Sequence, residues 1–250
     1  MSERGIQWFR FTAPANFYDL AGRLIPWFAA LTIALFAAGL YLGLVVAPPD
    51  YQQGDSYRII YIHVPTAWMG MFLYVLMAVY AAIGLIWRIK MAEIMAKAIA
   101  PTGALMTFFA LWTGALWGRP TWGVYWVWDA RLTSMLILLF LYLGYMALHA
   151  AIDDRQRASN ASAVLAMVGV VNVPIIYFSV QWWNTLHQGA SITVTDAPTM
   201  ATIMFVTLMI MVLAAWMYSI AVVLARARVE VLERERNARW VQERLEDGRT

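Results

Sequence analysis

The sequence has no cysteine among its 250 residues. This absence excludes a disulfide scaffold, a thiol redox centre, an iron–sulfur site and a covalently attached c-type haem, which requires C-x-x-C-H. Charge is also scarce, since 13% of the residues are charged, whereas a soluble domain usually has about 25%. The sequence has no G-x-x-x-x-G-K-[ST] phosphate-binding loop either, so this chain does not hydrolyse ATP by that route.

Hydrophobic residues take the place of the missing charge and make up 62% of the chain. A membrane helix needs about 20 consecutive apolar residues. Six uncharged runs meet this requirement: 24–46, 63–87, 98–118, 132–152, 161–180 and 200–225. The sequence therefore predicts an all-α integral membrane protein with six transmembrane helices. We expect one membrane domain over residues 1–225 and a charged helical tail over 226–250.

The basic residues predict the orientation, because Lys and Arg favour the cytoplasmic side of short loops. Three lie before residue 24, three within 88–97, two within 153–160 and seven from Arg226 onward, which is 15 of the 18. Six spans place all four segments on one side, so both termini are predicted to be cytoplasmic. The loop at 118–131, between spans three and four, then lies outside. The net charge of +3 is small, and the sequence has no nucleic-acid signature.

The tail alternates in charge sign. Glu230–Arg234 and Glu235–Arg239 are spaced i,i+4 in the order that stabilises a helix. We interpret the tail as a solvated extension of span six. The alternative is a docking surface for a cytoplasmic partner.

The outer loop contains the stretch TWGVYWVWDARLTS, residues 121–134. On a helix, Trp122, Trp126 and Asp129 would share one face, with Tyr125 beside them. On an extended strand, Trp128 would instead join Trp122 and Trp126. Because the Pro-Thr pair before the cluster suits a helix start, we favour a short helix lying along the membrane surface.

Two of the three histidines are predicted to lie on the same outer face. His63 opens span two, and His187 lies in the last outer loop. His149 lies near the cytoplasmic end of span four and is interpreted as structural. A lone histidine is more often a capping or packing residue than a ligand, but two on one face of a membrane protein are more suggestive.

These residues together suit a large, flat, apolar ligand with a metal centre. Indole faces can stack on a conjugated macrocycle, and neutral imidazoles can ligate an iron. Arg131, Arg119 and Arg58 are candidates to pair with carboxylates on the ligand edge. Asp129 could orient a donor or hold Arg131. Further candidates for aromatic contacts on the outer face are Trp117, Trp68, Trp182 and Trp183, although an interfacial belt of tryptophans is the plainer reading of the last three.

The motif W-G-x-x-W-x-W-D-x-R-L-T, from Trp122 to Thr133, resembles the tryptophan-rich "WWD" signature of the haem-handling proteins of cytochrome c maturation. YIHVPTAWM lies before it and WWNTLHQGASI after it. With six spans in 250 residues, this combination closely resembles the CcmC (haem exporter protein C) family rather than its larger synthetase-type relatives. The resemblance covers about residues 20 to 225.

The resemblance implies a protein that holds haem b non-covalently on the periplasmic face of the bacterial inner membrane. It implies His63 and His187 as axial ligands. It also implies a haem platform, to which we assign Trp122, Trp126, Trp128, Asp129 and, beside them, Tyr125. The haem would pass to a periplasmic chaperone, CcmE, within a complex with the ABC transporter-type subunits CcmA and CcmB and the small protein CcmD. ATP hydrolysis would belong to CcmA, and this chain would not be an enzyme.

Two alternatives remain open. A membrane b-type cytochrome would carry paired histidines inside its spans, but only His149 lies well within one; a redox titration linked to quinone turnover would favour this reading. A self-contained permease for haem or a small molecule would use polar residues inside the bundle. Asn172, close to Pro174, is the main candidate, and a proteoliposome assay without partners would decide.

Overall fold

The computed structural model describes residues 13–187 and 199–246. Six of its helices are long and apolar enough to cross a membrane, and its regular elements are helical. The predicted all-α, six-span fold is confirmed. Of the basic residues used to predict orientation, Arg4, Arg10 and Arg249 lie outside the described residues.

The helices follow one another in this order. Helix α1 (Pro14–Tyr41) continues into the π-helical turn η2 (Leu42–Val46), and the 3-10 turn η3 (Asp55–Ile59) leads into α2 (Ile60–Trp87). Helices α3 (Lys90–Trp122) and α4 (Ala130–Ala151) follow. The fifth span is formed by α5 (Arg155–Gly169) and α6 (Asn172–Trp182), the sixth by α7 (Thr202–Arg234), and α8 (Arg239–Glu246) comes last.

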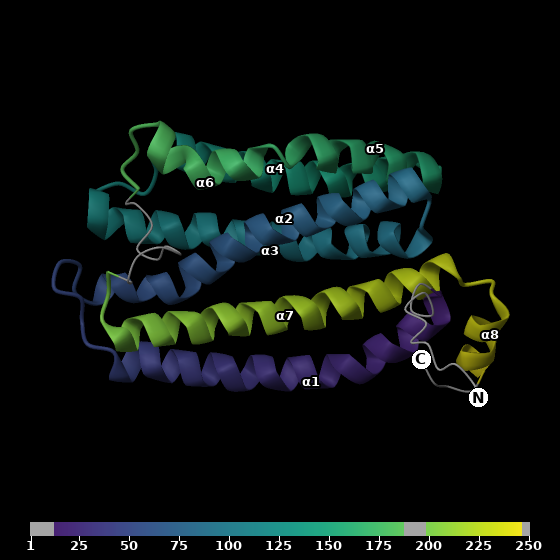
Figure 1. Cartoon of the computed structure of the whole chain (residues 1–250), viewed down its shortest axis with the longest axis horizontal. Helices are drawn as coiled ribbons and strands as arrows, with labels where there is room; N and C mark the ends of the chain where they lie inside the picture. Colours follow the sequence, from purple (N-terminus) through teal and green to yellow (C-terminus); the bar gives the residue numbers. More distant parts are fainter. Residues whose placement is uncertain (1–12, 188–198, 247–250) are drawn as a thin grey trace, which may run out of the picture.

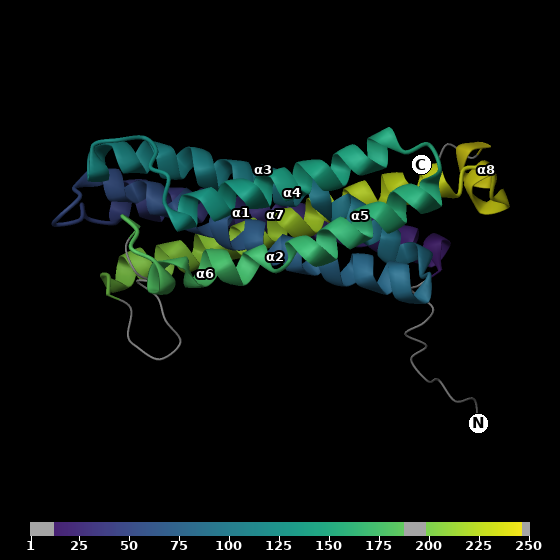
Figure 2. The same cartoon turned by 90° about the horizontal axis from the view of Figure 1, so that it is seen from above.

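The helices lie side by side in three layers (Figure 1). Helices α2 and α3 form the middle layer, with α4, α5 and α6 on one side and α1 and α7 on the other. The fully buried Tyr74 of α2 and Tyr142 of α4 pack edge-on with ring centroids 4.9 Å apart, and Ile99 of α3 belongs to the same buried core. The start of α1 lies at the same end as α8, and the α3–α4 connection lies at the opposite end (Figures 1 and 2).

Helix α3 begins earlier than its hydropathy predicts, so most of the expected loop at 88–97 is helical. It places Glu93 and Lys97 against the end of α7, where Arg234 pairs with Glu93 and Lys97 pairs with Glu230, both at 2.6 Å. The expected Glu230–Arg234 pair is therefore wrong, because both side chains bind α3 instead. The first part of the tail therefore joins α7 to α3 through two ion pairs and is not only a solvated extension.

The predicted surface helix in the tryptophan-rich loop is also wrong. Helix α3 continues through Pro120 and ends at Trp122, because Gly123 takes the left-handed conformation (φ +81°) that commonly terminates helices. Residues 123–129 are not helical. Helix α4 then starts at Ala130, where the side chain of Asp129 accepts a hydrogen bond from the Leu132 amide at 2.8 Å. This compact turn holds the loop close to the bundle.

Candidate functional site

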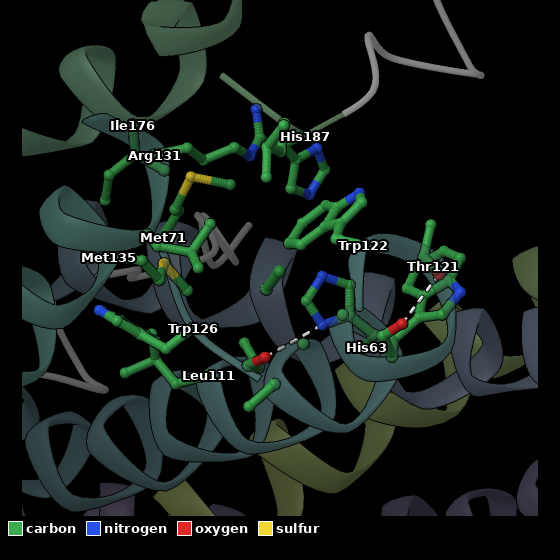
Figure 3. A pocket seen from close by; sticks show the side chains of 18 of the residues that line it. His63, Met71, Leu111, Thr121, Trp122, Trp126, Arg131, Met135, Ile176 and His187 are labelled. Carbon is green, nitrogen blue, oxygen red and sulfur yellow. Dashed lines mark hydrogen bonds between the residues drawn. The ribbon is translucent and has the colours of Figure 1, made fainter. Parts of the chain in front are cut away.

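A cavity opens at the end of the bundle that carries the α3–α4 connection (Figure 3). It encloses about 980 Å³, counting the open space at its mouth. Helices α2, α3, α4 and α6 contribute to its walls, together with the segment that follows α6. Most of the lining side chains are apolar or aromatic, and the few polar ones include His63, Arg131 and His187. This combination is typical of a site for a mostly apolar ligand with a few fixed polar contacts.

The two outer histidines meet in this cavity. His63 comes from α2 and His187 from the segment after α6, and their ring centres are 6.4 Å apart with the planes inclined by 31°. Two imidazoles on opposite sides of one metal, each bonded at about 2 Å, would have ring centres roughly 6 Å apart. The observed distance between the ring centres is close to this value. Within the described residues no group of three or more His, Asp or Glu side chains forms a competing metal site.

The His63 ring is held by α3. Its Nδ1 lies 3.0 Å from the Ala110 carbonyl oxygen and 3.2 Å from the Thr113 hydroxyl. A carbonyl can only accept, so Nδ1 carries the proton and donates. Thr113 donates its own proton to the Phe109 carbonyl at 2.5 Å, which leaves its oxygen free to accept from His63. His63 Nε2 is then unprotonated and can ligate a metal.

Close packing of α3 fixes the same ring. A Cβ atom at Gly114 would lie 2.9 Å from Cε1 of His63, so this position requires glycine for the two helices to approach. Trp117 packs edge-on against the ring, with centroids 5.7 Å apart. Its indole N–H donates to the Gln53 side chain at 2.8 Å, which ties the loop before α2 to the cavity wall.

The predicted aromatic platform divides into two parts. Trp122 and Trp126 line the cavity, and the Trp122 ring lies 6.3 Å from that of His187. Trp128 packs edge-on against Trp126 but is 77% exposed and does not line the cavity. Tyr125 is also exposed and outside the lining. The loop thus presents two indoles inward and two aromatic side chains to the surroundings.

The cavity contains two polar groups without partners. The Arg131 guanidinium makes no hydrogen bond or ion pair with any residue that the structure describes, although Asp129 lies within electrostatic reach. The indole N–H of Trp126 is buried and has no acceptor among the residues that the structure describes. A buried donor without an acceptor is costly. A carboxylate on a ligand would suit both groups.

The other two predicted edge contacts are arginines that already have partners. Arg58 forms an ion pair with Asp55 at 2.8 Å and also donates to the Gly43 carbonyl. Arg119 donates to the Gly123 carbonyl and is exposed. Neither lines the cavity. The ion pair of Arg58 and the hydrogen bonds of both arginines to backbone carbonyls stabilise the turns around the site.

The candidate outer-face tryptophans are also distributed unevenly. Trp117 lines the cavity, whereas Trp68, Trp182 and Trp183 are exposed and lie outside the lining. Trp182 stacks on Phe178 with ring centroids 5.2 Å apart. The three exposed tryptophans have the placement expected of an interfacial belt.

Two polar residues considered in the alternative readings have structural contacts. His149 packs against Tyr145 of its own helix, with ring centroids 5.0 Å apart, and does not line the cavity. The Asn172 amide donates to the Ser134 carbonyl at 2.8 Å and fixes the start of α6 to α4. His149 instead borders a small separate hollow that Lys97 and Glu230 also line.

Sequence reasoning did not identify several residues that build the site: Gln53, Met71, Ala110, Thr113, Gly114 and Ile176. Their roles depend on which helices are neighbours, which no local pattern reveals. The one available signal was the small pair Thr113-Gly114 on the outer half of span three, since small residues often allow close helix contact.

Known proteins of one family are similar to this chain over most of its length. Residues 7–242 match the family described as "CcmC: Heme exporter protein C". The chain is similar to a heme exporter protein C of Haemophilus influenzae, with 48% identity over 93% of this chain and 94% of that protein. It is 49% identical to one of Bradyrhizobium diazoefficiens, over 88% and 84% of the two chains. For one of Escherichia coli K12 the identity is 54%, over 71% and 73%. The chain therefore belongs to the haem exporter protein C family.

Proposed function

We propose that this chain holds haem b non-covalently on the periplasmic face of the bacterial inner membrane, with His63 and His187 as axial ligands. The observation that carries the proposal is the meeting of these two rings, 6.4 Å apart, in one cavity. They come from distant parts of the sequence, and the Nδ1 contacts of His63 leave its Nε2 available as a ligand.

The remaining lining residues suit the rest of the cargo. Trp122 and Trp126 offer indole surface to a flat macrocycle, each aromatic side chain being able to bury about 150–250 Å². The unpaired Arg131 suits a propionate. Two imidazoles would fill both axial positions of the iron, which disfavours oxygen chemistry. The site therefore holds haem and releases it to a partner, and it is not an enzyme active site.

Delivery is the second half of the proposal. The haem passes to a periplasmic chaperone of the CcmE type, in a complex with CcmA-, CcmB- and CcmD-like subunits. The names of the relatives support a haem export system. The cavity opens at the end of the bundle where Tyr125 and Trp128 are exposed, so a chaperone could reach one edge of the cargo there.

The test is a visible spectrum of the purified chain after loading with haem. His63→Ala and His187→Ala should each lower haem occupancy or change the ligation spectrum. His149→Ala is the matched control, because it removes the third histidine outside the cavity. Wild-type occupancy and spectrum in both site variants would overturn the proposal.

A further inference from the structure

A second hollow lies on the outside of the bundle, between α2 and α6. This α2–α6 groove is lined by Met71, Phe72 and Val75 from α2 and by Val173, Pro174, Tyr177 and Phe178 from α6. All seven side chains are apolar except for the Tyr177 hydroxyl. Phe72, Val75 and Tyr177 are exposed on helices long and apolar enough to span the membrane, so the groove faces lipid.

Only one layer of side chains separates this groove from the cavity. Met71 lines both. Ile176 lines the cavity, while its neighbours on α6 line the groove. Figure 3 shows Met71 and Ile176 on the same side of the cavity. Methionine is unbranched and adapts its shape easily, so this layer can open without a change in the helices' hydrogen bonds.

The helices on either side of the groove are joined weakly. Among the described residues no hydrogen bond or ion pair connects α2 with α6. Helix α6 is instead fixed to α4 through Asn172 and Ser134, and the helix of the fifth span is interrupted between α5 and α6 at Val170 and Val171. The α6 segment can therefore move relative to α2 while its start stays attached to α4.

The cavity's unpaired cation lies just behind this layer. Arg131 lines the cavity and lies within electrostatic reach of Tyr177, which lines the groove. An apolar ligand with a carboxylate would meet only hydrophobic surface in the groove and then a cation inside. The order of surfaces suits an amphiphilic macrocycle that arrives from the bilayer.

We propose that haem enters the cavity sideways from the lipid, through the α2–α6 groove, with Met71 and Ile176 moving aside. This inference rests on the proposed haem site and adds its route of loading. The competing route, entry through the aqueous mouth of the cavity, is an outcome of the same test.

The first test fills the groove in the full-length chain, reconstituted in liposomes whose lipid carries haem. Val75→Trp adds bulk at the lipid side of the groove, and Val79→Trp is the matched control one turn away on α2, exposed but outside the groove. Val75→Trp should reduce haem uptake from lipid to the background seen with His63→Ala. Val79→Trp should take up haem at the wild-type rate.

The second test uses the absence of cysteine in the sequence. A Val75→Cys/Val173→Cys pair is joined across the groove by a reducible bismaleimide. Leu44→Cys/Val206→Cys, exposed on η2 and α7, is the control pair. Cross-linking the groove should abolish uptake, and reduction should restore it. Cross-linking after loading should leave the haem spectrum unchanged.

The two proposals fail differently. Normal uptake from lipid in both Val75→Trp and the cross-linked groove, with uptake still dependent on His63, would refute the lateral route and leave the haem site standing. Normal haem binding in the His63 and His187 variants would refute the site itself, and with it the route.

Discussion

Replacing Thr113 by Val tests how the His63 ring is held. The substitution keeps the size of the side chain and removes the hydroxyl that lies 3.2 Å from Nδ1. Loss of a partner outside the metal's own ligands typically weakens metal binding 10–100-fold. Here the Ala110 carbonyl remains at 3.0 Å, so Nδ1 keeps one acceptor. We therefore expect Thr113→Val to weaken haem binding only by the free energy of one net hydrogen bond, about 0.5–1.5 kcal/mol. This corresponds to a roughly two- to twelvefold loss of affinity.

The assay is the rate at which the purified, haem-loaded chain loses haem to an excess of an apo-globin. Thr113→Val should release haem roughly two- to twelvefold faster, and Thr113→Ser, which keeps the hydroxyl, should stay near the wild-type rate. Thr107→Val is the matched control, because Thr107 is fully buried on the same helix and donates only to the Gly103 carbonyl. Equal release rates in Thr113→Val and Thr107→Val would refute the reasoning.

Three further predictions concern other contacts in the bundle. Gly114→Ala should lose haem while the helical circular dichroism is kept, because the added methyl displaces a ligand ring; retained haem with an unchanged spectrum would contradict this. Arg131→Ala should weaken haem binding and Arg119→Ala should not, as measured by equilibrium titration, since only Arg131 lies in the cavity without a partner; equal affinities would count against the propionate contact. Glu93→Ala should lower the melting temperature without changing the haem spectrum, because it leaves Arg234 unpaired at the far end of the bundle. Breaking such a pair costs about 3 kcal/mol or more when it is buried. An unchanged melting temperature would show that the ion pair contributes little.

The spans could be predicted because a membrane helix leaves a composition signal of its own length. Charge placement then put His63 and His187 on one face, and the structure brings their rings together. The ends of the helices could not be read from hydropathy, because amphipathic extensions such as the start of α3 are packed by partners elsewhere in the chain. Glu93 is buried there with partners from two other helices, Arg234 of α7 and Gln156 of α5.

The failure at the tryptophan-rich loop has a different cause, since its local signals were present in the sequence. Gly123 is a common terminator of helices, and Asp129 is a strong N-cap residue. Together they end α3 at Trp122 and start α4 at Ala130. The prediction of a surface helix relied on the Pro-Thr pair at 120–121 as a helix start and gave less weight to these two residues. By contrast, nothing local indicates that Gln53 belongs to the site, because it acts through Trp117, which is far away in the sequence.

The two proposed ligands differ in their support, and this difference bears on handover. His63 lies on a membrane-spanning helix, with Nδ1 bonded to α3 and its ring packed against Trp117. His187 follows the end of α6 in a non-helical stretch, where its backbone amide bonds to the Thr185 hydroxyl at 3.1 Å. A ligand on a packed helix keeps its position precisely, whereas a segment outside the helices can change conformation without disturbing the bundle. If both histidines ligate haem as proposed, exchange of the ligand would be less disruptive at His187. In the proposed function, His63 retains the haem while the side carrying His187 is the one from which a chaperone takes it.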